Sequence, residues 1–238
     1  MKNVLINGGS RGLGRAMVEL FSERGYSVAF TYRSSYAEAS ELAASTGALA
    51  IKADSSSEND VLRAVCTVEE EFGSVDILIN NAAISSFSLF TDISYDDWRK
   101  IFSVNLDGAF LYSKRILPGM INRKQGRIIN VSSMWGITGS SCEVHYSATK
   151  AALIGMTKAL AKEVGPSGIT VNCIAPGVID TEMNAKLSEE DISALKDETP
   201  LMRIGTPREV AEAALFLAGD GAAFITGEVL SVNGGFLI

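Results

Sequence analysis

The stretch Val4-Leu5-Ile6-Asn7-Gly8-Gly9-Ser10-Arg11-Gly12-Leu13-Gly14 decides the fold that we expect for this chain. Its apolar start predicts a short buried strand. The residues after it place apolar side chains on one face of a helix, at Ala16, Met17, Leu20 and Phe21. Between the two elements, Gly8 permits a tight turn, Gly12 lets the backbone approach a ligand and Gly14 lets the helix pack closely. This order indicates a pyrophosphate site, because helix amides attract anions.

The glycine spacing bears on which ligand this loop binds. The loop has the pattern Gly-x3-Gly-x-Gly, whereas the common dinucleotide fingerprint is Gly-x-Gly-x2-Gly. It also lacks the Lys-Ser/Thr ending of a nucleoside-triphosphate loop. A glycine-rich turn without a ligand is the alternative, but the flanking strand and helix favour a dinucleotide.

Short apolar runs alternate with longer amphipathic segments along the rest of the chain. The runs cover residues 4–6, 28–30, 49–51, 77–79, 128–131 and 170–174, and Val229–Val232 is expected to add a seventh strand. Such runs are typical of parallel strands buried on both faces. We therefore predict an α/β chain with a three-layer α/β/α Rossmann fold, built on a doubly wound parallel sheet of about seven strands. Residues 1–238 are expected to form a single domain.

Composition excludes several function classes. The chain has 238 residues, 47% of them hydrophobic, and a formal net charge of −7, which argues against nucleic-acid or anionic-membrane binding. The apolar run at the N-terminus is too short for a signal peptide, and no segment approaches a membrane span, so a cytoplasmic location is expected. The three cysteines have no metal-like spacing and are expected to be reduced thiols, at Cys66, Cys142 and Cys173.

The end of the second predicted strand bears on the choice of dinucleotide. An NAD enzyme usually presents a carboxylate here to the ribose 2′-hydroxyl, and this chain has none. Tyr32 and Arg33 stand there instead, and Arg33 together with Arg11 offers the charge and the fork geometry for a 2′-phosphate. NADP is therefore favoured over NAD, although each arginine could also be an ordinary solvated charge.

Two further loops follow predicted strands. Asp54 could accept a hydrogen bond from the adenine amine, or it could simply cap a turn ahead of the helix expected at Glu58–Phe72. The sequence Asn80-Asn81-Ala82-Ala83 supplies amides and small side chains where a cofactor could lie close to the backbone. An ordinary turn is the alternative for this second loop.

Tyr146-Ser147-Ala148-Thr149-Lys150 places a phenol and an ammonium one helical turn apart. Such a pair can make a proton donor if the phenol is made more acidic, which requires about 1.4 kcal/mol for each pKa unit. Lys150 and a bound nicotinamide cation could supply this effect. The alternative is surface decoration, because this spacing is common on exposed helices.

Taken together, these motifs resemble those of the short-chain dehydrogenase/reductase family, in the same order and over essentially the whole chain. The matching positions are residues 7–14, Asp54, residues 80–83, Asn105, Ser133, Tyr146, Lys150, and residues 176–181. Three positions depart from the family pattern: Asn7 stands where Thr is usual, Ala83 where Gly is usual, and Ser55 where an apolar residue is common. No catalytic group is lost.

The resemblance implies a catalytic set of four residues and no metal. Tyr146 would donate a proton to a carbonyl oxygen, and Lys150 would lower the tyrosine pKa and hold the nicotinamide ribose. Ser133, chosen over Ser132 by its spacing to Tyr146, would stabilise the developing oxyanion. Asn105 would bind a relay water. The expected cofactor contacts are Gly8, Ser10, Arg11, Gly12, Leu13, Gly14, Tyr32, Arg33, Asp54, Ser55, Asn81, Ala82, Ala83, Tyr146, Lys150, Pro176, Gly177, Ile179 and Thr181.

The loop at residues 8–12, the run at residues 130–133 and the ending Ile225-Thr226-Gly227-Glu228 most resemble those of 3-oxoacyl-[acyl-carrier-protein] reductases within the family. Such enzymes reduce a 3-ketoacyl thioester with NADPH in fatty-acid synthesis. The resemblance suggests that Arg123, Lys124 and Arg127 lie near the site entrance and contact an acidic acyl carrier protein. Ser167 weakens this assignment, because carrier-using relatives often place Arg there. The alternatives are reduction of another small ketone, sugar or steroid, and a non-catalytic dinucleotide-binding sensor.

Two segments are expected to shape the substrate pocket. The loop before Tyr146 carries Trp135, Ile137, Ser140 and the only histidine, His145, which we do not expect to act as an acid or base. Residues 180–200 are polar, with one apolar helical face, and are expected to close as a lid or to form a static helical insert. That face comprises Met183, Leu187, Ile192 and Leu195.

The sequence also predicts a homotetramer or homodimer. Apolar residues within 104–121 cover more than one helix face, which indicates a second packing partner. Gly155 and Ala159 would let another helix approach the helix of Tyr146, and the apolar end at residues 236–238 needs cover.

Overall fold

The computed structural model describes residues 2–184 and 188–238. Its seven strands are β1 (Asn3–Asn7), β2 (Ser27–Tyr32), β3 (Leu49–Lys52), β4 (Ile77–Asn80), β5 (Gly126–Val131), β6 (Ile169–Pro176) and β7 (Val229–Val232). They form one parallel sheet in the order β3-β2-β1-β4-β5-β6-β7. The order reverses between β1 and β4, which confirms the doubly wound sheet. Ligands in such sheets bind beyond the carboxyl ends of the strands at this reversal.

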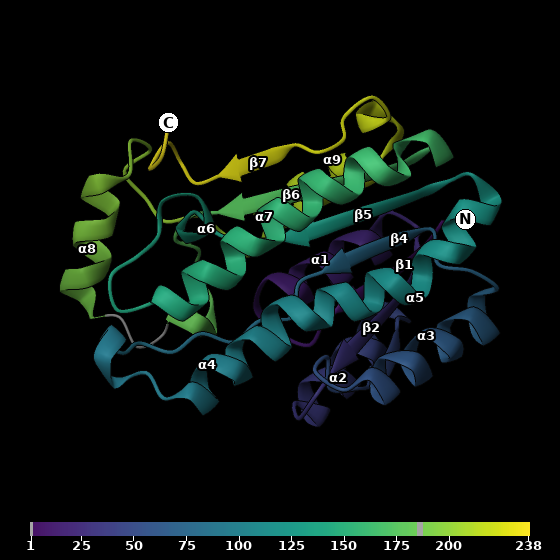
Figure 1. Cartoon of the computed structure of the whole chain (residues 1–238), viewed down its shortest axis with the longest axis horizontal. Coiled ribbons are helices and arrows are strands. Elements are labelled where there is room, and N and C mark those ends of the chain that lie inside the picture. The colour runs from purple at the N-terminus through teal and green to yellow at the C-terminus, as the bar shows by residue number, and fades with distance from the viewer. Residues whose placement is uncertain (1, 185–187) are drawn as a thin grey trace.

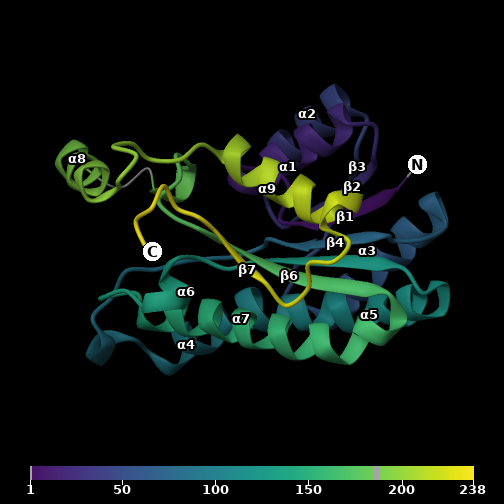
Figure 2. The same cartoon turned by 90° about the horizontal axis from the view of Figure 1, so that it is seen from above.

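Helices cover both faces of the sheet (Figures 1 and 2). They are α1 (Gly12–Glu23), α2 (Tyr36–Thr46), α3 (Glu58–Phe72), α4 (Tyr95–Phe102), α5 (Gly108–Arg123), α6 (Trp135–Thr138), α7 (Val144–Val164), α8 (Glu189–Glu198) and α9 (Pro207–Ala218). α1, α2 and α9 pack on one face, and α3, α5 and α7 on the other. A π-helical turn, Ser103–Asp107, joins α4 to α5. The layers are those predicted for a three-layer α/β/α fold.

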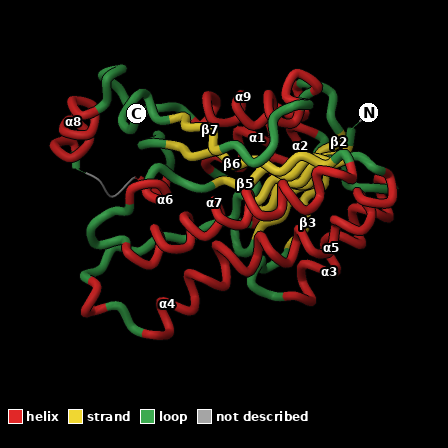
Figure 3. Tube along the Cα trace, turned by 45° about the horizontal axis from the view of Figure 1, so that its top comes forward, coloured by secondary structure: helices red, strands yellow, loops and turns green. Residues whose placement is uncertain are grey.

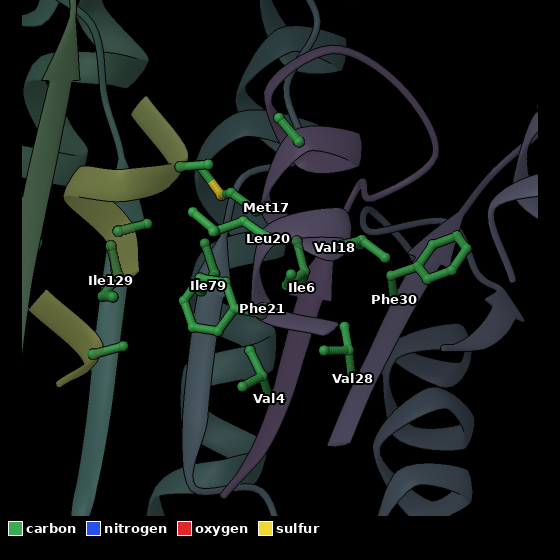
Figure 4. Packing of buried hydrophobic residues seen from close by; sticks show 14 of the residues in the cluster. Val4, Ile6, Met17, Val18, Leu20, Phe21, Val28, Phe30, Ile79 and Ile129 are labelled. Atoms are coloured by element: carbon green, nitrogen blue, oxygen red, sulfur yellow. The ribbon is translucent and has the colours of Figure 1, made fainter. Parts of the chain in front are cut away.

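The apolar face of α1 fixes the glycine loop against the sheet. Met17, Leu20 and Phe21 are fully buried, and Figure 4 shows them over β1, beside side chains of β4 and β5. Burying each such side chain stabilises the fold by about 1.5 to 3 kcal/mol. The helix that begins at the loop is therefore held rigidly at its first turn.

We expected every strand to be buried on both faces. This is wrong for the two edge strands, β3 and β7. Residues 49–51 of β3 are only half-buried and Lys52 is exposed, and β7 is likewise incompletely buried. The reason is that an edge strand pairs on one side only, so the covering helices reach it less completely. The inner strands β1, β4, β5 and β6 are buried almost throughout.

Within the segment expected to form a lid, helix α8 lies apart from the core. α8 has no buried residue, although Ile192 and Leu195 of the expected apolar face are half-buried, and Figure 3 shows the helix beyond the end of the sheet. Leu187 lies outside the described residues. Among the described helices, none combines the length and the apolar character needed to cross a membrane.

Candidate active site

The carboxyl ends of the strands meet at one end of the molecule. In Figure 1 the arrowheads of β4, β6 and β7 point toward the end where α6 and the start of α7 lie. The glycine loop leaves β1 at this end. Gly8 adopts φ +70°, and its carbonyl accepts a hydrogen bond of 2.8 Å from the Asn81 side chain. The predicted loops after β1 and β4 are therefore joined directly.

Gly14 allows close packing of α1 on the loop, whereas Gly12 borders a cleft. A Cβ on Gly14 would lie 2.1 Å from the Gly8 carbonyl oxygen and 2.7 Å from Asn81 Nδ2, so only glycine lets α1 start this close. Gly12 has φ +53°, and a Cβ there would face the Thr181 side chain at 3.6 Å. A cleft of about 380 Å³ opens at this point, lined by Gly12, Arg15, Ala16, Glu19, Asp180, Thr181, Glu182 and Pro207. The structure thus brings Gly12 and Thr181 together across one cleft.

A ladder of asparagine side chains crosses the carboxyl ends of β1, β4 and β5. Asn7 Nδ2 donates to Asn80 Oδ1 at 2.8 Å, and Asn80 Nδ2 donates to Asn130 Oδ1 at 2.8 Å. Asn7 Oδ1 accepts hydrogen bonds from the amides of Asn81 and Ala82. The side chains of Asn7, Asn80 and Asn130 are buried and hydrogen-bonded, so the ladder fixes the relative positions of the loops. Asn7, which departs from the family pattern, is thus a structural member of the site.

The two serines after β5 have different surroundings. Ser132 Oγ donates to the backbone carbonyl of Lys150 at 2.8 Å, which ties β5 to α7. Ser133 Oγ accepts a hydrogen bond from the Trp135 amide at 3.1 Å, and its side chain also interacts with the Tyr146 phenol. This placement agrees with the choice of Ser133 as the serine that accompanies Tyr146.

The phenol of Tyr146 is buried, with 8% of the residue exposed. Burial raises the pKa of Tyr146, the negative charge of Glu143 raises it further, and the Ser133 hydroxyl lowers it. We expected the site to lower this pKa through Lys150. The chain by itself does the opposite, because desolvation of the phenolate outweighs the hydrogen bond from Ser133.

The position of the Lys150 ammonium explains why its charge does not offset the rise in the Tyr146 pKa. Nζ donates to the Val131 carbonyl at 2.8 Å and lies 5.5 Å from the centre of the Tyr146 ring. Burial lowers the pKa of Lys150 to about 8. The ammonium is therefore beside the face of the ring rather than on the phenol oxygen.

Asn105 lies in the π-helical turn, an element that often occurs at functional sites. Its Oδ1 accepts from the Ile84 amide at 2.8 Å, and its Nδ2 donates to the Ile84 carbonyl and to Thr149 Oγ1. These bonds reach across the fold rather than along the helix of Asn105. They connect the loop after β4 to α7, one residue before Lys150.

The other expected cofactor contacts line the same end of the sheet. Ser10, Tyr32 and Ser55 are buried, whereas Arg11 and Arg33 are exposed at the ends of their elements. Asp54 Oδ1 accepts from the amide and the hydroxyl of Ser56. Asp54 thus closes the turn ahead of α3, while the helix itself is capped by Ser57. Leu13, in the first turn of α1, is partly buried against the core, and Ala83 continues the loop after Ala82.

The loop after β6 completes this edge. Gly177 donates to the Val232 carbonyl at 2.9 Å, and a Cβ on Gly177 would lie 2.8 Å from Asn233 Cα. Pro176 ends the strand and accepts a hydrogen bond from the Met134 amide. Ile179 is buried, and Thr181 follows it at the cleft. The expected segment 176–181 therefore lies beside the glycine loop.

We expected Arg123, Lys124 and Arg127 to lie near the entrance of the site. That expectation is wrong for the site in their own chain. Arg127 stands at the amino end of β5 and Ser133 just beyond its carboxyl end. Six residues of extended strand separate them by about 20 Å. Arg123 donates to the Val75 carbonyl at this same far end. These cations do not flank the entrance beside Tyr146.

Glu143, the N-cap residue of α7, and two serines that bond to the start of this helix were not predicted from the sequence. Ser85 Oγ donates to Glu143 Oε1 at 2.5 Å, and Ser86 Oγ lies 2.8 Å from His145 Nε2. His145 is buried, and its Nε2 faces the Ser86 hydroxyl. An acid one helical turn before Tyr146 was the signal that could have identified Glu143.

The expected pocket residues divide between the site and the surface. Trp135 packs edge-on against Phe236 at 5.9 Å, so the chain end covers α6. Ser140 donates its amide to Ser147 Oγ, and Ile137 is exposed. The described residues contain no group of three or more His, Cys, Asp or Glu side chains suited to a metal.

Comparison with known proteins adds the family. A family model described as Enoyl-(Acyl carrier protein) reductase matches residues 8–237. The 3-oxoacyl-[acyl-carrier-protein] reductase FabG of Aquifex aeolicus is 43% identical, over 97% of this chain and 95% of that protein. The FabG of Escherichia coli is 40% identical, over 98% and 96%. The solved structure of a short-chain dehydrogenase/reductase variant from Serratia marcescens superposes with a TM-score of 0.93 at 36% identity, over 99% and 97%.

Proposed function

This chain belongs to the short-chain dehydrogenase/reductase family of oxidoreductases acting on CH–OH and C=O groups, and on that premise we propose that it reduces a ketone with NADPH, with Tyr146 as the proton donor. One observation carries the proposal. The Tyr146 phenol is buried beside Ser133, one helical turn before Lys150, at the same end of the sheet as the glycine loop. These are the groups that carbonyl reduction needs.

Each residue has a defined task in this proposal. When bound, the dinucleotide supplies a hydride to the carbonyl carbon. The raised pKa keeps Tyr146 protonated until charge develops on the carbonyl oxygen, which then accepts the phenol proton. Ser133 hydrogen-bonds the same oxygen and stabilises its charge. Lys150 stabilises the phenolate that results, which requires Nζ to turn from the Val131 carbonyl toward the phenol.

Asn105 is proposed to support this site through Ile84 and Thr149 and to hold a relay water between Lys150 and solvent. The fit of the glycine loop to a pyrophosphate rests on Gly8, Gly12 and Gly14, because two have positive φ and the third has no room for a Cβ. The remaining expected contacts, which lie between Tyr32 and Thr181 in the sequence, are at the carboxyl end of the sheet. We propose on this ground that they bind the cofactor.

The choice of NADPH over NADH rests on the exposed guanidinium groups of Arg11 and Arg33 and on the lack of an acid after β2. Arg33→Ala should weaken NADPH binding by about tenfold and leave NADH binding unchanged, since a charged hydrogen bond is worth about 1.5 kcal/mol or more. Equal turnover with NADH in the wild type would overturn the choice.

A 3-oxoacyl thioester is the proposed substrate, and the support is the name of relatives at about 40% identity. An acyl carrier protein is a proposed partner, with Ser167 counting against it. Reduction of another small ketone is the second candidate, favoured by that same departure. A dinucleotide-binding sensor without turnover is the remaining alternative.

A homodimer or homotetramer is proposed from unpartnered apolar surface. Phe110 and Ile121 on α5 are 49% and 41% exposed, and nothing lies within 4 Å of a Cβ built on Gly155 of α7. Ile238 is fully exposed. Sedimentation at micromolar concentration should show an oligomer, and a monomer alone would contradict this. We also propose that residues 1–238 act as one domain whose segment 180–200 closes over the site.

The test is a substrate panel with NADPH, following loss of the reduced-nicotinamide absorbance. The panel contains 3-ketoacyl thioesters, ethyl acetoacetate, quinones, sugars and steroids. The proposal expects the highest kcat/KM with the 3-ketoacyl thioesters. Turnover of a sugar or steroid alone would support the second candidate, and binding of NADPH without turnover of any compound would support the sensor.

A further inference from the structure

Glu143 occupies the N-cap position of α7, but its side chain does not cap the helix. A Ser, Thr, Asp or Asn side chain at this position usually accepts a hydrogen bond from a first-turn amide. The Glu143 side chain makes no such bond and instead accepts from Ser85 Oγ at 2.5 Å. Ser85 lies in the loop that leaves the carboxyl end of β4. The carboxylate therefore joins the start of α7 to the loop after β4.

The same carboxylate lies near the reacting group. Glu143 and Tyr146 are three residues apart, on neighbouring positions of one helix face. The charge of Glu143 raises the pKa of the phenol, second only to burial among the causes. Glu143 itself is half-buried, so a substrate that reaches Tyr146 also comes within range of its charge.

Two further bonds fix the loop that contacts this carboxylate. Ser86 Oγ lies 2.8 Å from His145 Nε2, and the Ser88 amide donates to the Cys142 carbonyl at 2.8 Å. Together with the bond from Ser85 they tie the loop after β4 to the start of α7. A side chain on a fixed loop and helix end keeps its charge at one place when substrate binds.

The other ionisable groups near Tyr146 are directed away from the substrate. Lys150 donates to the Val131 carbonyl and, in the proposed reaction, turns toward the phenol oxygen, while Cys173 faces Lys150 from β6 as a buried thiol whose pKa is raised. His145 faces Ser86. Among the groups named here, Glu143 is the one that is half-buried and carries a negative charge.

We propose that Glu143 is a specificity-determining residue that disfavours substrates carrying a negative charge close to the ketone. The site would then select neutral 3-keto esters and thioesters over free 3-keto acids, because a carboxylate beside Glu143 adds like-charge repulsion in a partly desolvated cleft. The inference rests on the proposed carbonyl reduction and names its substrate class.

The test compares ethyl acetoacetate with acetoacetate, which share the ketone and differ in charge. Wild type should prefer the neutral ester. Glu143→Gln keeps an oxygen to accept from Ser85 and removes the charge, so it should shrink the ester-to-acid ratio of kcat/KM by about tenfold, which corresponds to ~1.4 kcal/mol. Glu143→Asp, which retains the charge, should keep most of the preference. Glu71→Gln removes an exposed acid of α3 far from the site and should leave the ratio unchanged.

The outcomes separate the two proposals. Turnover of the ester with a ratio that is the same in wild type and Glu143→Gln would overturn the role of Glu143 and leave carbonyl reduction standing. A ratio that falls equally in Glu143→Gln and Glu143→Asp would also overturn it, since loss of packing rather than charge would then be the cause. No turnover of either compound, together with none of any 3-ketoacyl thioester, would overturn the proposed function itself.

Discussion

Gly14→Ala tests whether the glycine loop and α1 form one rigid unit. The new Cβ would lie 2.1 Å from the Gly8 carbonyl oxygen, 2.7 Å from Asn81 Nδ2 and 2.9 Å from Gly9 Cα. Two of these atoms are backbone, so no side-chain rotation relieves the contact. Extending the shortest contact to 3.0 Å moves the loop or the helix by about 0.9 Å. α1 resists this, because Met17, Leu20 and Phe21 are fully buried beneath it.

The expected cost is at the upper end of overpacking, about 3 kcal/mol. For a chain of this length that lowers Tm by about 6 to 12 °C. Binding of NADPH should weaken as well, because the loop amides move by a large part of a hydrogen-bond length. Calorimetry with and without the dinucleotide measures both effects.

Gly119→Ala is the matched control for this experiment. Gly119 lies inside α5, where a new Cβ meets only the flexible end of Arg123 at 3.3 Å. Alanine should stabilise that helix by about 0.5 to 1 kcal/mol. If Gly14→Ala is as stable as wild type and binds NADPH equally well, the close packing assigned to Gly14 is refuted.

Three further predictions concern stability. Asn80→Ala removes the centre of the asparagine ladder and strands the amide of Asn7 and the oxygen of Asn130, so denaturant unfolding should show a loss of about 3 kcal/mol; an unchanged midpoint would contradict the role of the ladder. Burial lowers the pKa of Lys150 to about 8 from 10.5 in an unfolded chain, so between about pH 8 and 10.5 the unfolded state binds more protons. Across that window, without cofactor, the wild-type free energy of unfolding should rise with pH relative to Lys150→Met, and parallel curves would argue against a buried ammonium. Arg203 and the Thr206 amide hold the pKa of Glu209 at about 2, below its usual 4.5, so the stability advantage of wild type over Glu209→Gln should be full above about pH 4.5 and lost as the pH falls toward 2; an advantage that persists at pH 2 would exclude this ion pair as its source.

The strands could be predicted from sequence because burial on both faces leaves a run of apolar residues that nothing else explains. Val229–Val232 was predicted with the bounds that the structure gives it. The edge position of β3 could not be predicted, because strand order is decided by crossovers between distant segments. Its run at residues 49–51 is as apolar as the runs of inner strands, and only the pairing shows that it has one neighbour.

The residues of the site were predictable where each follows the carboxyl end of a strand, as Ser133 and Asn81 do. The contacts of Asn105 and Glu143 were not, because each joins segments more than 20 residues apart through one side chain. The position of Arg127 at the far end of β5 could have been predicted from the sequence. It precedes the apolar run at 128–131, so the direction of the strand already places it at the end away from the site.

The measurement that bears most directly on the central claim tests hydride transfer with an isotope label and proton donation with a variant of Tyr146. Ethyl acetoacetate is reduced with NADPH deuterated at its transferable position, and the product is analysed for deuterium at the former ketone carbon, for wild type and Tyr146→Phe. The account predicts deuterium at that carbon, and turnover at least about 100-fold slower in the variant with NADPH binding retained. Deuterium elsewhere in the product, or a Tyr146→Phe variant as fast as wild type, would contradict it.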